Sequence, residues 1–100
     1  MTNEQINRAV AEELGWRPIP NSSTRWYKPG ETIGVEATFT DDHNAVAEIR
    51  RAIKSDETYE FVCALLPIVG TGTAWGLINA TPRQQSEAFL RMRGKWRDGE

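Results

Sequence analysis

Four consecutive residues, Arg25-Trp26-Tyr27-Lys28, combine two aromatic rings with two cations. Indole and phenol rings stack on a nucleobase, and flanking cations hold its phosphate, so this run predicts a site for a small anionic ligand. In a β-strand alternate side chains share a face, which places Arg25 and Tyr27 on one side and Trp26 and Lys28 on the other. The alternative interpretation is that Trp26 packs in the core and the cations are solvated.

Other rings and cations extend this picture. Trp16-Arg17 and Trp75 supply two further indoles and a guanidinium. Arg83 lies in the first turn of a predicted helix, where backbone N–H groups also face an anion, and is a weaker ligand-binding candidate. The tail holds further cations around a tryptophan, namely Arg91, Arg93, Lys95, Trp96 and Arg97. These side chains are suited to an anion, a nucleic-acid backbone or another subunit, although the dipole of the preceding helix also favours cations there.

No set of residues supports a catalytic or metal site. His43 is the single histidine, beside Asp41 and Asp42, whereas a metal centre needs three or four ligands. Cys63 lies in an apolar run that disfavours its thiolate, and no Gly-x-Ser-x-Gly elbow is present. The run Gly70–Gly76 has neither dinucleotide-loop nor P-loop spacing and predicts a turn. We therefore expect a non-enzymatic protein without cofactor or metal.

The composition predicts one domain spanning residues 1–100. With 100 residues, 39% hydrophobic and 26% charged, the chain can bury a single modest core. A formal net charge of −2 argues against a module dedicated to specific nucleic-acid binding. Cys63 is the only cysteine, the first residues lack a signal-peptide pattern, and the longest apolar run, Phe61–Val69, is about half a membrane span. We expect a soluble cytoplasmic protein that binds no membrane.

The chain opens with a predicted amphipathic helix over residues 3–14. Thr2 and Gln5 have the spacing of a capping box. Gly15 supplies a left-handed stop, and Trp16 is expected to fold back onto the last turn.

A hairpin is predicted next. Residues 17–23 predict a loop because two prolines remove backbone donors. Strands are predicted over residues 24–28 and 32–39. The second strand has four apolar side chains on one face, Ile33, Val35, Ala37 and Phe39.

The second half predicts mainly helices. A helix capped by Thr40 or Asp41 has the apolar stripe Ala45, Val46, Ile49, Ala52 and Ile53. Residues 56–66 predict a helix capped by Asp56 and stopped by Pro67, with a buried strand as the alternative. Its expected stripe is Tyr59, Val62, Cys63 and Leu66.

The end of the chain predicts a short strand and a helix. The strand is expected over residues 74–80. The helix is expected from Pro82 to about Arg93, with a capping box of Thr81 and Gln84. Its expected core face is Ala88, Phe89 and Met92, and Gly94 closes it.

Three segments resemble the phage ABA sandwich domain family, a group of short phage and prophage proteins. They are Ile6–Trp16, Phe39–Arg51 and Asn79–Arg91, which together cover much of the chain. Gln85 and Ser86 depart from the family, in which many members have Arg and Ala. The resemblance implies phage origin and helices flanking a small sheet, and it implies no catalytic residues.

These observations combine into one expectation. The fold class is α+β, with three or four amphipathic helices flanking a small, mainly antiparallel sheet in an α/β/α sandwich-like arrangement. The function is non-enzymatic binding of a small anionic ligand through Arg25, Trp26, Tyr27, Lys28 and Arg83, with sequestration of a cyclic or linear nucleotide immune signal as its sharpest form. Such a protein is expected to act as a homo-oligomer in the bacterial host cytoplasm. The alternative is a protein–protein module that binds a host defence factor or a virion component, with tryptophans as hot spots.

Overall fold

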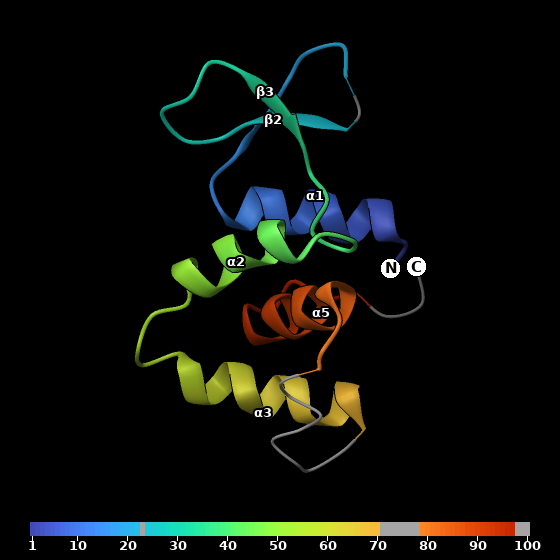
Figure 1. Cartoon of the computed structure of the whole chain (residues 1–100), viewed down its shortest axis with the longest axis vertical. Helices are drawn as coiled ribbons and strands as arrows, with labels where there is room; N and C mark the ends of the chain where they lie inside the picture. Colours follow the sequence, from blue (N-terminus) through green and yellow to red (C-terminus); the bar gives the residue numbers. More distant parts are fainter. Residues whose placement is uncertain (23, 71–78, 98–100) are drawn as a thin grey trace.

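The computed structural model describes residues 1–22, 24–70 and 79–97. The elements in these ranges are, in chain order, α1 (Asn3–Glu13), β1 (Arg17–Pro18), β2 (Arg25–Tyr27), β3 (Gly34–Glu36), α2 (His43–Ala52), α3 (Thr58–Val69) and α5 (Pro82–Met92). The α+β class and the small antiparallel sheet are thus confirmed. Figure 1 shows the sheet at one end of the molecule, α1 and α2 beside it, then α5, and α3 at the opposite end.

The sheet has the order β1-β2-β3, and both pairs of strands are antiparallel. Trp26 stands opposite Pro18 on one side and Val35 on the other. Its side chain is 4% exposed and belongs to the same buried cluster as Ile6 and Val10 of α1. One face of the sheet therefore packs on α1, and the alternate side chains of β2 must point away from it.

Helix α5 is the centre of the helical part and packs against α1, α2 and α3. Phe89 is fully buried in the cluster shared with the sheet. Trp16 and Phe39 extend this cluster, with ring centroids 5.0 Å apart. On the α3 side a smaller cluster joins Leu65 to Ala88. The core thus continues from the sheet through α5 to α3.

Two capping boxes fix the helix starts that the sequence predicts. In α1 the Gln5 N–H donates to Thr2 Oγ1 at 3.2 Å, and the Thr2 N–H donates to Gln5 Oε1 at 2.8 Å. In α5 Thr81 and Gln84 form the same pair of hydrogen bonds at 3.1 and 2.9 Å. Gly15 ends α1 with φ of 83°, and the Trp16 N–H then donates to Ala11 O at 2.9 Å. Trp16 therefore folds back on the last turn as predicted.

The hairpin differs from the prediction at its ends. Arg17 and Pro18 form β1, so residues 17–23 are not simply a loop. A strand this short is defined by its pairing with β2 rather than by its own sequence, and Pro18 is tolerated because β1 is an edge strand. The two predicted strands are shorter than expected, and Ile33 is 76% exposed instead of sharing the buried face. In α2 the cap is Asp42, whose carboxylate accepts from the Asn44 N–H at 2.8 Å, and not Thr40 or Asp41.

Helix α3 corrects two further predictions. It continues through Pro67 to Val69, where Gly70 with φ of 74° ends it. Proline removes one hydrogen bond in the last turn, and the flanking helix tolerates this loss. The predicted buried stripe is wrong, because Tyr59 is 78% exposed and Cys63 is also exposed. The helix instead turns another set of side chains toward the core, namely Phe61, Ala64, Leu65 and Ile68.

Two arginine side chains join the helices through hydrogen bonds. Arg93 donates to Glu13 Oε1 at 3.1 Å and to Glu57 Oε1 at 3.2 Å, which links α5 to α1 and to the segment before α3. Arg50 donates through Nε and Nη2 to Gln85 Oε1 at 3.1 and 2.9 Å, which links α2 to α5. Within the described ranges no helix is both long and apolar enough to cross a membrane. The predicted strand over residues 74–80 lies almost wholly outside the described residues.

Candidate functional site

The run Arg25–Lys28, which comprises β2 and the residue after it, is divided between the two faces of the sheet. Trp26 points into the core, so the alternative interpretation describes its position. Lys28 follows on the same side, where its Nζ lies 2.6 Å from Glu48 Oε1 and 5.5 Å from the centre of the Trp16 ring. Neither side chain therefore shares a face with Arg25 and Tyr27.

The opposite face, which we call the outer sheet face, is formed by Arg17, Ile19, Arg25, Tyr27 and Glu36. Arg17 of β1 is the cross-strand partner of Tyr27, and Arg25 is the partner of Glu36 in β3. Both arginines are exposed and Tyr27 is half-buried. The side chains of Arg17 and Arg25 thus leave the sheet on the same face as Tyr27, from neighbouring positions.

Gly34 lies beneath the side chains of the outer sheet face. It stands opposite Tyr27, and a Cβ at this position would overlap Ile19 Cδ1. The Ile19 side chain therefore reaches across β2 and lies on the bare backbone of β3. Arg25 also crosses this backbone, because its Nη2 donates to Gly34 O at 3.0 Å. This hydrogen bond holds the Arg25 guanidinium on the sheet.

The polar groups of the outer sheet face are largely unpaired. The side chains of Arg17 and Tyr27 have no hydrogen bond or ion pair with another described residue. The only carboxylate of the face is Glu36, which likewise has no ion pair with a described residue. With two arginines and one glutamate, the face has a formal charge of +1, although the whole chain has −2.

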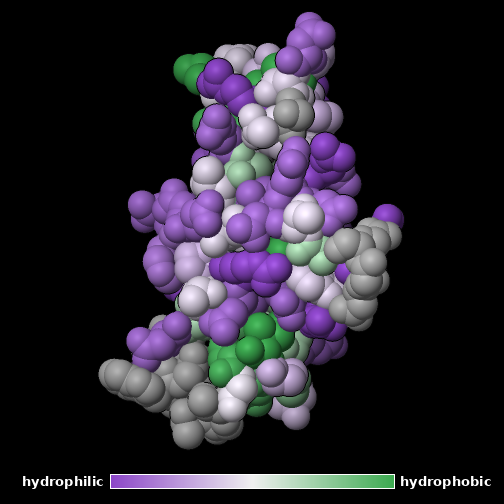
Figure 2. All heavy atoms as spheres, turned by 90° about the vertical axis from the view of Figure 1, so that its right-hand side faces the viewer, coloured by the Kyte–Doolittle hydropathy of each residue, from purple (hydrophilic) through white to green (hydrophobic). Residues whose placement is uncertain are grey.

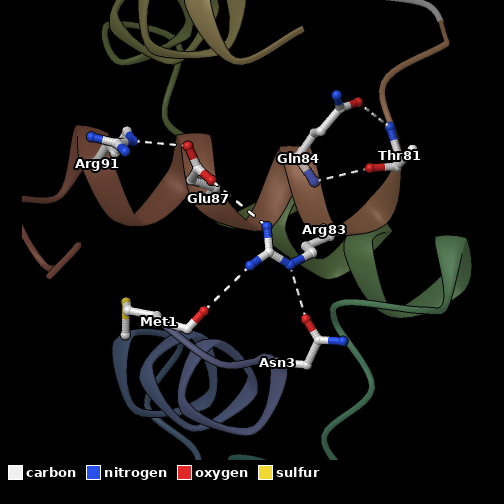
Figure 3. A network of polar contacts seen from close by, with 7 residues as sticks. All are labelled: Met1, Asn3, Thr81, Arg83, Gln84, Glu87 and Arg91. Carbon is white, nitrogen blue, oxygen red and sulfur yellow. Dashed lines mark hydrogen bonds and ion pairs between the residues drawn. The ribbon is translucent and has the colours of Figure 1, made fainter. Parts of the chain in front are cut away.

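Arg83 lies elsewhere and has a structural role. Its Nε donates to Asn3 Oδ1 at 2.9 Å and its Nη2 donates to Met1 O at 3.3 Å, as Figure 3 shows. Its Nη1 lies 3.9 Å from Glu87 Oε1 on the next turn of α5. Arg83 therefore anchors the start of α1, and Figure 1 places α1 between α5 and the sheet. The structure does not bring Arg83 to Arg25 and Tyr27.

The cations of the basic tail contact different parts of the molecule. Arg91 pairs with Glu87 at 2.9 Å and lies over the Trp96 ring, with Cζ 4.9 Å from its centre. Arg93 forms ion pairs with Glu13 and Glu57. Lys95 and Arg97 line a groove of about 560 Å³ against α1, together with Met1, Gln5, Arg8, Ala9, Glu12 and Glu13. Cations therefore also gather in this groove, apart from the outer sheet face.

The remaining chemical groups stay apart. His43 begins α2 at an exposed position, and Cys63 is exposed on α3. Among residues 1–22, 24–70 and 79–97 no three His, Cys, Asp or Glu side chains are placed to hold a metal ion. Trp75 and most of the predicted Gly70–Gly76 turn lie outside the described residues. The chain matches no family model, no curated protein and no solved structure.

Four residues at the outer sheet face, Arg17, Ile19, Gly34 and Glu36, were not among the predicted site residues. Arg17 and Ile19 lie in a segment that the sequence predicted to be a loop. Gly34 has no side chain that could indicate a binding role. Their alternation, Arg17-x-Ile19, continues the alternation of Arg25-x-Tyr27 on the neighbouring strand. This matched alternation is the signal that identifies them.

Proposed function

We propose that the chain is a non-enzymatic phage accessory protein that binds a small anionic ligand with an aromatic ring, a nucleotide or cyclic nucleotide, on the outer sheet face. The observation that carries the proposal is that Arg17, which has no hydrogen-bond or ion-pair partner among the described residues, and Arg25, held on Gly34 O, share one face of the sheet with Tyr27 at neighbouring positions. A phenol ring between guanidinium groups combines stacking on a base with charge-assisted hydrogen bonds to phosphate.

Each side chain has a distinct task in this binding. Tyr27 stacks on the base, and Ile19 supports the apolar edge of the ring. Arg17 is free to bind phosphate with its planar fork. The hydrogen bond from Arg25 Nη2 to Gly34 O already fixes this side chain in the free protein. Binding of phosphate by its remaining N–H groups therefore costs little further rotamer entropy.

The outer sheet face covers only one side of a ligand. Sites that bind small molecules tightly are concave, so a second subunit is needed to enclose the ligand from the other side. We therefore propose that the protein acts as a homo-oligomer, with the ligand at the subunit contact.

The proposed biological role is sequestration. A nucleotide that signals infection in the bacterial cytoplasm is withdrawn when it binds a protein that does not convert it. This role rests on the resemblance of three segments to the phage ABA sandwich domain family, and the ligand class rests on the chemistry of the outer sheet face.

Isothermal titration calorimetry tests the binding with AMP, ADP-ribose and cyclic dinucleotides. Loss of one charge-assisted arginine–phosphate contact removes about 1.5–3 kcal/mol, so Arg17→Gln and Arg25→Gln should each weaken binding roughly 10- to 100-fold. Lys95→Gln is the matched control, because it removes a cation from the groove beside α1. Equal weakening by the control, or no binding to any of these nucleotides, contradicts the proposal.

A second candidate function, a protein–protein module for a host or virion protein, is favoured by α3. Tyr59 and Cys63 are exposed on this helix, and Figure 2 shows a hydrophobic patch at the level of α3. Exposed apolar patches of this kind are typical of protein contacts. The rate of maleimide labelling at Cys63 distinguishes the two functions, because a partner on α3 protects the thiol whereas a nucleotide on the outer sheet face leaves the rate unchanged.

A further inference from the structure

A groove of about 250 Å³ lies between α1 and the inner side of the sheet. Glu4, Asn7 and Arg8 line it from α1. Thr24, just before β2, Trp26 in β2 and Ala37, just after β3, line it from the sheet. We call it the α1–sheet groove. It is separate from the outer sheet face, because Trp26 and the alternate residues of β2 point in opposite directions.

Only some of its polar groups are free to bind. The Asn7 amide is occupied by Thr40, donating to Oγ1 at 3.3 Å and accepting from the backbone N–H at 3.0 Å. Glu4 and Arg8 are exposed and have no ion pair or hydrogen bond with a side chain in the described part of the molecule. The free charged groups are therefore one carboxylate and one guanidinium.

These two charges lie one helical turn apart. Residues four apart on a helix are neighbours on the same face, with roughly 6 Å between their Cβ atoms. Glu4 before Arg8 is the order that favours a direct ion pair, yet the two side chains form none within 4.0 Å. The groove thus presents a positive and a negative group side by side.

The rest of the wall consists of Trp26, Ala37 and Thr24. Trp26 is 4% exposed, and its indole N–H donates no hydrogen bond to any described residue. Ala37 adds a methyl group from the end of β3, and it is held there by its N–H bond to Thr24 O at 3.3 Å. A ligand in this groove meets an indole edge and a methyl group as well as the two charges.

We propose that the α1–sheet groove binds a free α-amino acid with an apolar side chain. The ligand carboxylate pairs with Arg8, its ammonium pairs with Glu4, and its side chain packs on Trp26 and Ala37. The zero net charge of the lining disfavours a multiply charged nucleotide, and the volume is below the ~300 Å³ at which ligand pockets usually begin. A small zwitterion fits both the charge and the size.

The expected affinity is low, because the groove is small and open. For a ligand of about a dozen heavy atoms in such a groove we expect a Kd on the order of 1 mM. Amino acids reach such concentrations in cells, so occupancy would follow their supply. This site is independent of the nucleotide site, and neither proposal depends on the other.

Titration of the ¹⁵N-labelled protein, followed by amide chemical shifts, tests the proposal with phenylalanine and leucine as probes. Two analogues carry one charge each, phenethylamine without the carboxylate and 3-phenylpropionate without the ammonium. We expect saturable shifts at residues of the groove for the amino acids, and binding about tenfold weaker for both analogues. Equal binding of an analogue, or no saturable shift up to tens of millimolar, overturns the proposal.

Three variants assign the roles of the charges. Glu4→Gln and Arg8→Met should each weaken phenylalanine binding about tenfold. Glu12→Gln, one turn further along α1 and outside the groove lining, is the matched control and should leave it unchanged. The exchange Glu4→Arg with Arg8→Glu keeps both charges and should recover binding relative to either single variant. Failure of that recovery in a folded protein, judged by its amide spectrum, contradicts the paired-charge mechanism.

Discussion

Replacement of Arg93 by methionine is the sharpest test of how the helices are held together. The guanidinium donates to Glu13 Oε1 at 3.1 Å and to Glu57 Oε1 at 3.2 Å, and its Nε lies 3.1 Å from Glu57 Oε2 without hydrogen-bond geometry. The guanidinium itself lies over the Phe89 ring, with Cζ 5.1 Å from the centre. Methionine keeps an unbranched apolar side chain at this position and removes the guanidinium, with its charge, its donors and its contact with the Phe89 ring.

The expected cost follows from burial. The side chains of Arg93, Glu13 and Glu57 are 24%, 20% and 21% exposed, so water reaches them only in part. Removal of one partner from a fully buried ion pair costs about 3–5 kcal/mol, whereas exposed pairs contribute about 0–1 kcal/mol. We expect Arg93→Met to lower the free energy of unfolding by about 2–3 kcal/mol, which corresponds to a fall in Tm of roughly 8–24 °C for a domain of this size.

Urea denaturation followed by circular dichroism measures this loss. Arg91→Met is the matched control, because Arg91 lies on the same helix and pairs with Glu87 beside an aromatic ring, but with a side chain that is 40% exposed. The control should cost no more than about 1 kcal/mol. If the two variants differ by less than about 0.5 kcal/mol, burial does not set the strength of the Arg93 contacts and the reasoning fails.

Three further predictions concern other parts of the fold. Pro67→Ala should raise the free energy of unfolding by about 1 kcal/mol in urea denaturation, because it restores a helical N–H bond to Cys63 O; an unchanged or lower value contradicts this. The hydrogen bond with Cys63 and repulsion from its thiolate raise the pKa of Tyr59 above 10.0. The raised pKa means that the Tyr59–Cys63 interaction stabilises the fold below the pKa of the unfolded phenol. This stabilisation is lost as pH rises through the pKa of the folded phenol. Cys63→Ala should lower the Tyr59 pKa, followed by the ring ¹³C shift, and an unmoved titration refutes the assignment. Gln85→Ala should cost about 1–2 kcal/mol in a thermal melt, since it leaves Arg50 and a backbone carbonyl without their partner, and a neutral effect would show that solvent replaces those bonds.

Local signals in the sequence predicted the helix ends well. The capping boxes at Thr2 and Thr81 depend on residues three apart, and Gly15 ends a helix through its own backbone freedom. Such features need no information from distant parts of the chain. Both starts and the first stop were therefore correct to within a residue.

Features that depend on tertiary pairing were not predictable in the same way. Helix α3 is apolar on most sides, so its periodicity did not decide which side meets α5, and Tyr59 was assigned to the wrong face. Strand β1 exists only because Arg17 and Pro18 pair with β2. Arg83 fits an anion site by its place in the first turn of a helix, but the neighbouring start of α1 occupies it.

The candidate site was predicted in part for the same reason. Alternation along β2 separated Arg25 and Tyr27 from Trp26, and the structure has this separation. The sequence did not decide which of the two faces is buried, because that depends on where α1 lies. Arg17 joins the face only through cross-strand pairing, which a loop interpretation excludes.

The most direct test of nucleotide binding on the outer sheet face is a chemical-shift titration of ¹⁵N-labelled protein with a cyclic dinucleotide. We expect saturable shifts centred on the backbone amides of Arg17, Arg25, Tyr27 and Gly34, with the arginine Nε–H signals of Arg17 and Arg25 moving most. Shifts centred on the groove of Lys95 and Arg97 or on α3, or no saturable shift at millimolar ligand, would contradict it.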